Sequence, residues 1–266
     1  MRYLVTMLTL SLILLMAAGG AAQIDQTIAR VAETEAHLPW FWSPPMEGFF
    51  EIPYTFESDG LHRVLDARGH DKKGALRLHL ERTAVLGGIF NRCVSENGVS
   101  PCSAPMLAAY QRGNEKVVFG PEEKSAVRDR RLQFWRDFPQ AFRFEALGSG
   151  RFRFIPRREY NPGTDSHLQV LAAIQGEFTL DLQTYEVTAL SYEVLKDVEI
   201  PGRKLSKGTK YSVTLTNSVN GHYLPSHLVF EQPMGKDRAI QAEDYSNYRR
   251  FTTDTKLLFG DVPEPR

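Results

Sequence analysis

The feature that most constrains the fold is a run of strand-like segments from His167 to Phe259. These segments are rich in β-branched and aromatic residues, and turn-forming residues separate them. In the segment KYSVTLTNSV, apolar and polar residues alternate, which gives a strand one apolar and one polar face. A meander of such strands needs a cover for its apolar face. We therefore expect a mainly β chain of the α+β class, in which helices cover an antiparallel sheet.

Turn-forming residues predict two hairpins. Asn220-Gly221 lies between two strand-like segments and is typical of a tight hairpin turn. Residues 141–156 alternate rings with charged residues on either side of Gly148-Ser149-Gly150, which predicts a hairpin with a three-residue loop. The arginines of this hairpin fall on the face opposite the rings, so we interpret that face as solvated and not as a nucleic-acid platform. Gly176 is expected at a turn of the meander.

The first 22 residues have the layout of a secretory signal peptide. Arg2 precedes an apolar core from Leu4 to Met16, and Gly20 and Ala22 are the small residues expected at a cleavage site. An uncleaved membrane anchor is the alternative, but the core is shorter than the roughly 20 apolar residues that span a bilayer. We expect cleavage after Ala22, which leaves 23–266 as a single β-rich domain. The mature protein is expected to be soluble, and periplasmic or secreted.

Charge composition argues against a nucleic-acid partner. The chain has 32 Lys and Arg residues and 32 Asp and Glu residues, so no global positive field attracts a polyanion. We also expect no cofactor.

The two cysteines, Cys93 and Cys102, flank a short turn-rich loop. In an exported chain this spacing favours a disulfide between them, with two free thiols or half of a metal site as alternatives. A metal site is not expected, because no CxxC pair accompanies the cysteines and the nearest histidine, His79, is well separated. His79 alternates with Leu76, Leu78 and Leu80 in an amphipathic strand and is expected to face solvent. A polar region, continuing through residues 112–115, follows the loop.

An aromatic stretch follows a predicted N-terminal helix over residues 23–37. Pro39 ends the helix, and the sequence then crowds rings that include Trp40 and Trp42 among prolines. Such a patch forms part of a core or a plug between elements, or it lines the wall of a ligand space. Trp40 and Trp42 are therefore candidate ligand-binding residues.

Residues 121–137 are predicted to form a second helix. Pro121 stands at its first position, two glutamates occupy its first turn and positive charges come later. A helical projection places Trp135, Phe138, Phe134 and Leu132 on one face, with Arg131 inside that face. Either Arg131 extends its charged head past the apolar stripe to solvent, or it binds an anion at the lip of an apolar site. We interpret this helix as a lid, and its three rings and Arg131 as candidate ligand-binding residues.

Motifs of catalysis are absent from the sequence. It contains no GxSxG elbow, no HExxH and no glycine-rich phosphate loop. Asp165, Ser166 and His167 are adjacent, whereas the members of a catalytic triad converge from distant positions. We therefore expect no enzyme activity.

Residues 120–260 resemble uncharacterised exported bacterial proteins related to the outer-membrane lipoprotein-sorting family. The resemblance rests on a strand reading G-x-φ-x-φ-D, where φ is apolar, and on a later segment with a proline after an aromatic residue. These positions are Gly176, Phe178, Leu180, Asp181, Tyr223 and Pro225. The resemblance implies a strongly curved, unclosed antiparallel barrel with a helical lid, which binds acyl chains between sheet and helices. The N-terminal third matches the pattern poorly.

These observations predict a non-catalytic periplasmic binder or carrier of a lipid or a lipoprotein acyl chain. Its partners would be a lipid or an acylated protein, with transient membrane contact. The first alternative is an envelope scaffold with a packed interior that binds an envelope protein. The second is a hydrolase whose site uses scattered residues such as Asp181 and His222.

Overall fold

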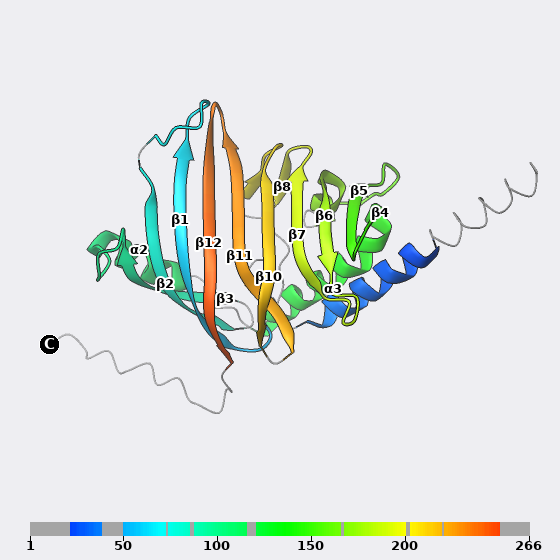
Figure 1. Cartoon of the computed structure of the whole chain (residues 1–266), viewed down its shortest axis with the longest axis horizontal. Coiled ribbons are helices and arrows are strands. Elements are labelled where there is room, and N and C mark those ends of the chain that lie inside the picture. Colours follow the sequence, from blue (N-terminus) through cyan, green and yellow to red (C-terminus); the bar gives the residue numbers. More distant parts are fainter. Residues whose placement is uncertain are drawn as a thin grey trace, which may run out of the picture.

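Ten strands form one curved antiparallel sheet that does not close into a barrel (Figure 1). The computed structural model describes residues 22–38, 50–72, 74–85, 88–115, 121–165, 168–200, 203–219 and 221–250. The strand order is β3-β2-β1-β12-β11-β10-β7-β6-β5-β4, and a separate two-stranded sheet joins β8 to β9. The expected fold class, an unclosed antiparallel sheet with helices, is confirmed.

The elements follow the sequence in this order. The strands of the large sheet are β1 (Tyr54–Leu65), β2 (Leu76–Val85), β3 (Gly88–Glu96), β4 (Phe142–Gly148), β5 (Arg151–Pro156), β6 (Ile174–Leu180), β7 (Val187–Val194), β10 (Lys210–Val219), β11 (His222–Met234) and β12 (Asp237–Arg250). The small sheet contains β8 (Val198–Ile200) and β9 (Arg203–Leu205). The helices are residues 22–37, α2 (Ala104–Glu115), α3 (Pro121–Ala141) and the short 3-10 helix η1 (Leu168–Ala173).

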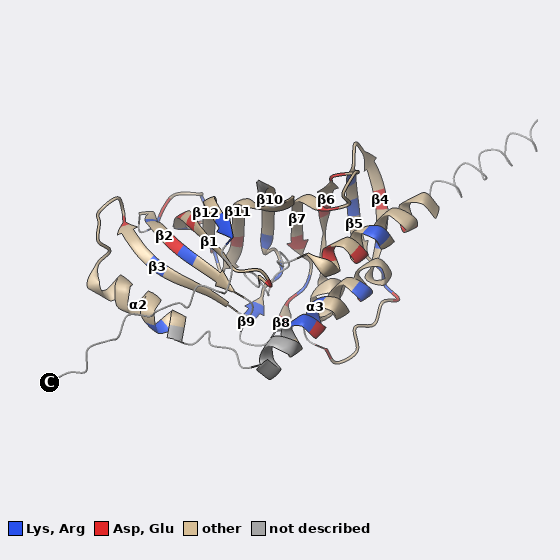
Figure 2. Ribbon diagram, turned by 90° about the horizontal axis from the view of Figure 1, so that it is seen from below, with Lys and Arg blue, Asp and Glu red and all other residues tan. Residues whose placement is uncertain are grey.

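The helices lie on one side of the sheet, at its two ends (Figure 2). Helix α2 packs beside β3, whereas α3 and helix 22–37 lie beneath the β7–β4 end. We call the face on the helix side the inner face and the opposite face the outer face. In the part of the chain that the structure describes, no helix combines the length and apolarity needed to cross a membrane.

Alternation along the strands explains which residues are buried. On β10, Tyr211, Val213 and Leu215 are buried, and the intervening residues point to the outer face. On β5, Phe152 and Phe154 are buried for the same reason. The inner face therefore collects the apolar residues of each strand, as the meander predicts.

The hairpin turns follow the predicted residues with one difference. Gly221, at the turn between β10 and β11, has φ of +83°, which glycine adopts without strain. In the β4–β5 hairpin, Gly148 pairs with Arg151, so the loop has two residues and not the three expected. The register shifts between Ala146 and Gly148, and Gly148, with φ of +89°, is the last residue of β4 to pair before the turn.

Three other sequence predictions are wrong in detail. The polar region after the cysteine loop forms α2, because Met106 and Tyr110 pack against apolar residues of β2 that are distant in sequence. The first residues of the meander, 168–173, form η1 instead of a strand. Gly176 lies inside β6, where a Cβ atom would come within 1.9 Å of the Ser191 carbonyl oxygen. Glycine is needed there for a close approach of two strands, not for a turn.

Candidate functional site

The three rings that the sequence predicted for ligand binding lie together in a packed core beneath α3. Trp135 is 2% exposed, and its ring centroid lies 5.3 Å from that of Phe134 and 5.1 Å from that of Phe138. Phe138 also meets Phe178 of β6, at 6.2 Å between ring centroids. The expected packing of α3 over the sheet is confirmed. Contact of these rings with a ligand stays a prediction.

Arg131 lies inside this core and is bound to the protein itself. Its guanidinium forms an ion pair with Glu51 and donates a hydrogen bond of 3.2 Å to the Leu38 carbonyl oxygen. Arg128 adds a second contact to Glu51, at 3.6 Å. The interpretation that Arg131 extends to solvent is wrong, because its side chain is buried and Glu51 neutralises it. Leu132, in contrast, is 38% exposed and does not share the buried face.

Two of the predicted site residues, Trp40 and Trp42, lie outside the described residues, as do residues 1–21 of the predicted signal peptide. The nearby rings Phe50, Tyr54 and Phe56 are buried. Phe50 lies 5.7 Å from Tyr54, and Phe56 stacks on Tyr248 of β12 at 4.9 Å between ring centroids. This part of the aromatic stretch therefore belongs to the core.

Cys93 and Cys102 have geometry compatible with the predicted disulfide, with Cα atoms 6.0 Å apart. Both are buried with Leu78 and Leu80 of β2 in a small hydrophobic cluster, against which α2 packs. We call this the α2 cluster. The pair thus connects the end of β3 to the start of α2 and holds that helix over the sheet edge.

The apolar surface of the inner face is divided. The α2 cluster covers β2 and β3, and the main core fills the space beneath α3 and continues onto β1 and β12. Between them β1 contributes Ser58, Gly60 and His62, β12 contributes Gln241 and Glu243, and β2 contributes Arg82. We call these six residues the inner strip. The strip is polar at a position where a continuous sheet core would be apolar.

A hollow of about 470 Å³ lies at one end of the inner strip. The strand register places Leu76, His62, Gln241 and Phe230 in one row across β2, β1, β12 and β11, and all four line the hollow. Ala239 extends the lining along β12. The volume falls within the range of small-molecule sites, and the lining combines apolar surface with the polar side chains of His62, Arg63, Gln232 and Gln241.

The other end of the strip carries a buried ion pair. Arg82 and Glu243 lie 3.0 Å apart, and Glu243 is 4% exposed. The pair crosses over β1, because Arg82 is the register partner of Phe56 and Glu243 that of Gly60. Ser58, between Phe56 and Gly60, therefore lies beneath the pair. Small residues on β1 make room for the long side chains from both neighbouring strands.

The inner strip is connected to the hollow through side chains. Gln241, which lines the hollow, donates a hydrogen bond to Glu243. The side chains of His62 and Glu243 both come within 4 Å of the point that a Cβ at Gly60 would occupy. Gln241 and His62 would therefore stand between a molecule in the hollow and the ion pair.

The tyrosines near the ion pair of Arg82 and Glu243 are shielded from solvent. Burial raises the pKa of Tyr248 and of Tyr110; the charge of Glu243 adds to this rise and that of Arg82 opposes it. The Tyr248 hydroxyl donates a hydrogen bond of 2.8 Å to the Pro225 carbonyl oxygen. Arg82 lies 5.6 Å above the ring of Tyr245.

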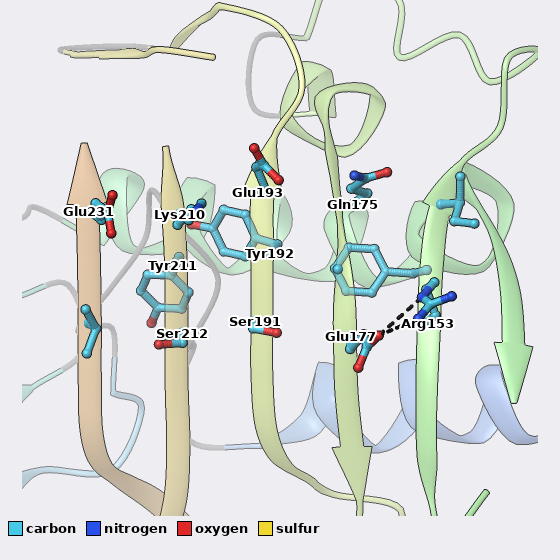
Figure 3. Close-up of a pocket in the computed structure, with 14 residues that line it drawn as sticks. Arg153, Gln175, Glu177, Ser191, Tyr192, Glu193, Lys210, Tyr211, Ser212 and Glu231 are labelled. Carbon is cyan, nitrogen blue, oxygen red and sulfur yellow. Dashed lines mark hydrogen bonds and ion pairs between the residues drawn. The ribbon is translucent and has the colours of Figure 1, made fainter. Parts of the chain in front are cut away.

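A second hollow, of about 690 Å³, lies on the outer face across β5, β6, β7, β10 and β11 (Figure 3). Its floor is formed by Ser191 and Ser212, and charged side chains of both signs surround the floor, including Glu193 and Lys210. At one side Glu177 accepts hydrogen bonds from Arg153 and Arg151, which lower its pKa in that order. Ile155 and Val229 add apolar surface to the lining, so this hollow combines apolar and charged groups.

The residues that carry the family resemblance connect elements of the fold. Tyr223 donates a hydrogen bond of 2.8 Å to Asp181, across 42 residues of sequence. Hydrogen bonds from the Gln183 backbone and then from Tyr223 lower the pKa of Asp181. His222, the other residue named for a hydrolase site, lies 3.5 Å from the buried carboxylate of Glu186. These contacts tie the β6–β7 turn to the β10–β11 hairpin.

The described residues contain no group of three or more His, Cys, Asp or Glu side chains placed to hold a metal ion.

The inner strip was missed in the sequence, although one signal was present. Leu76, Leu78 and Leu80 mark the buried face of β2, and Arg82 is the next residue on that face. A charged residue that continues an apolar alternation indicates a buried partner. The identity of that partner, Glu243, depends on the pairing of β1 with β12.

Comparison with known proteins gives likenesses of fold only. No protein-family model and no curated protein sequence matches the chain. Among solved structures, it is similar to a LolA superfamily protein from Nitrosomonas europaea, with 9% identity, a TM-score of 0.29, and coverage of 86% of this chain and 96% of that one. It is also similar to an outer membrane lipoprotein-sorting protein domain from Vibrio parahaemolyticus, with 10% identity, a TM-score of 0.32, and coverage of 76% and 86%.

A DUF1329 family protein from Desulfovibrio piger matches with 11% identity, a TM-score of 0.32, and coverage of 91% of this chain and 97% of that one. The lipoprotein-sorting group that the sequence resembles is thus found again among the solved structures. At this level of similarity, the likeness identifies no ligand and no site residue in this chain.

Proposed function

We propose that this chain is an exported, non-catalytic protein that binds the apolar chain of a lipid or of an acylated protein on the inner face of its sheet. The observation that carries the proposal is the hollow of about 470 Å³ between the main core and the α2 cluster. A sheet whose only role is structural would bury this part of its inner face under a continuous core. Here the apolar surface is interrupted where β1 and β12 meet.

The lining of the hollow fits an apolar ligand with modest polar recognition. Leu76, Phe230 and Ala239 supply apolar surface, and Gln241 and His62 supply hydrogen-bonding groups on one wall. About ten buried CH₂ groups contribute on the order of 8 kcal/mol before the cost of association is subtracted. Affinity for a chain would therefore come mainly from burial.

The absence of catalysis is part of the proposal and is supported by where the histidines lie. His79 is bonded to Asp59 at 2.9 Å, and His227 to Asp244 at 2.7 Å. Both pairs lie on the outer face, away from the hollow. His62 does line the hollow, but the Ser58 hydroxyl on the same strand has no hydrogen-bond partner among the described residues, so the contact between a nucleophile and its base is not made there.

A scaffold that binds an envelope protein is the second candidate, and the outer hollow favours it. That surface carries charges of both signs beside apolar side chains and spans five strands (Figure 3). Protein interfaces of the non-obligate kind combine polar and apolar groups in a similar way. The two candidates use opposite faces of the sheet, so variants can distinguish them.

The test is binding of a pyrene-labelled acyl chain to a matched pair of variants. Ala239→Phe fills the inner hollow, whereas Ala242→Phe adds the same ring to the outer face of the same strand. The unchanged protein and Ala242→Phe should bind the probe at micromolar concentrations, and Ala239→Phe should bind at least tenfold more weakly. Mass spectrometry of lipids that co-purify from the native envelope would identify the ligand. If all three proteins fail to bind and no lipid co-purifies, the scaffold is the better description.

A further inference from the structure

Three buried polar atoms of the inner strip have no hydrogen-bond partner among the described residues. They are the hydroxyl oxygen of Ser58, Nε of Arg82 and one carboxylate oxygen of Glu243, which contacts Arg82 only as an ion pair. Ser58 is 0% exposed. Each buried group without a hydrogen bond costs about 1 to 3 kcal/mol, so a strip that leaves three of them is prepared for a polar group from elsewhere.

The atoms offer both kinds of hydrogen bond. Nε of Arg82 donates, the carboxylate oxygen of Glu243 accepts, and the Ser58 hydroxyl does either. They lie behind the lining of the hollow, next to Gln241 and His62, which belong to that lining and also approach Glu243 or Gly60. A ligand chain in the hollow would bring its linking group to this position.

Charge decides which linking group fits. Arg82 and Glu243 neutralise each other in a buried position. A free carboxylate would bring a second negative charge, and Arg63, the arginine that lines the hollow, is already paired with Asp71. Burying an unpaired charge is costly. A neutral amide or ester brings a carbonyl oxygen for Arg82, and an amide also brings an N–H for Glu243.

We propose that the inner strip recognises the neutral amide or ester carbonyl at the head of a linked acyl chain and discriminates against the free fatty acid. This inference rests on the proposed function, because it places the chain in the inner hollow. It assigns Ser58, Arg82 and Glu243 as specificity residues, which touch the linking group and not the alkyl tail.

The experiment compares a pyrene-labelled fatty acid with its N-methyl amide and its methyl ester at pH 8, by fluorescence titration of the full mature chain. The amide should bind at least about tenfold more tightly than the acid. It gains one buried hydrogen bond, and it avoids the cost of burying the negative charge of the acid. The ester should lie between them, because it has the carbonyl oxygen but no N–H.

Variants then test which residues cause the preference for the amide over the acid. Arg82→Met combined with Glu243→Leu replaces the pair by apolar side chains of similar size, and should reduce amide binding to the level of the acid. Ser58→Ala, a smaller change in case the double variant does not fold, should weaken amide binding several-fold and leave acid binding unchanged. The matched control is Arg92→Met with Glu81→Leu, an exposed ion pair that joins β2 to β3 on the outer face, which should leave the ratio unchanged.

Each outcome separates the two proposals. Equal binding of amide and acid by the unchanged protein overturns this inference and leaves the proposed function. Tighter binding of the acid also overturns it and shows an anion site instead. A failure of all three probes to bind removes the proposed function and the inference together.

Discussion

Replacement of Trp135 by alanine should remove a large part of the stability of the fold. The indole is 2% exposed and contacts the rings of Phe134 and Phe138. Deleting a buried tryptophan costs about 3 to 5 kcal/mol, because the loss of transfer free energy is joined by the cost of a cavity that the neighbouring rings only partly fill. This is a large fraction of the about 5 to 15 kcal/mol that stabilises a typical domain.

Urea unfolding followed by far-ultraviolet circular dichroism measures the difference in the free energy of unfolding. Leu132→Ala on the same helix is the matched control, because Leu132 is 38% exposed and its loss should cost less than about 1 kcal/mol. A cost for Trp135→Ala no greater than that of the control would refute the assignment of α3 to the main core.

The same variant tests the sequence-based prediction that the rings of α3 contact a ligand. The inner hollow is lined by β1, β2, β11 and β12 and not by Trp135, so acyl binding per folded molecule should not change. A large loss of binding with little loss of stability would instead place the ligand beneath α3.

Further predictions concern the loop, two glycines and one carboxylate. Cys93 and Cys102 should resist alkylation until a reductant is added, as intact mass will show, and loss of their bond should cost roughly 2 to 3 kcal/mol. Gly176→Ala should destabilise by more than about 1 kcal/mol in urea unfolding, because its Cβ would strike backbone, whereas Gly113→Ala in α2 meets nothing within 4 Å and should stabilise slightly. Glu177 should titrate below the ordinary glutamate pKa in an NMR experiment, because arginine hydrogen bonds lower its pKa in the folded state. The stabilisation that follows from this shift is present above the unfolded pKa and is lost as the pH falls through the folded pKa.

Local patterns found most of the elements but not all of their ends. Pro121 and the charges after it predicted the start of α3, which continues to Ala141 because Phe138 and Ala141 are also buried. Helix α2 was missed, since its sequence is polar and is stabilised by contacts with β2 and by the cysteine pair. Arg131 was recognised as unusual on an apolar face, but its partner Glu51 lies in the bend before β1, far away in sequence.

The sequence by itself determined that this protein is an antiparallel sheet with one apolar face and helices over it, because alternation and turn residues act over a few neighbouring positions. Only the tertiary structure decided that β12 returns to pair with β1, since strand order depends on contacts between distant segments. That pairing brings Glu243 to Arg82 across Ser58 and divides the apolar surface. The candidate site exists only where β1 and β12 meet in the sheet. No local sequence pattern specifies that pairing.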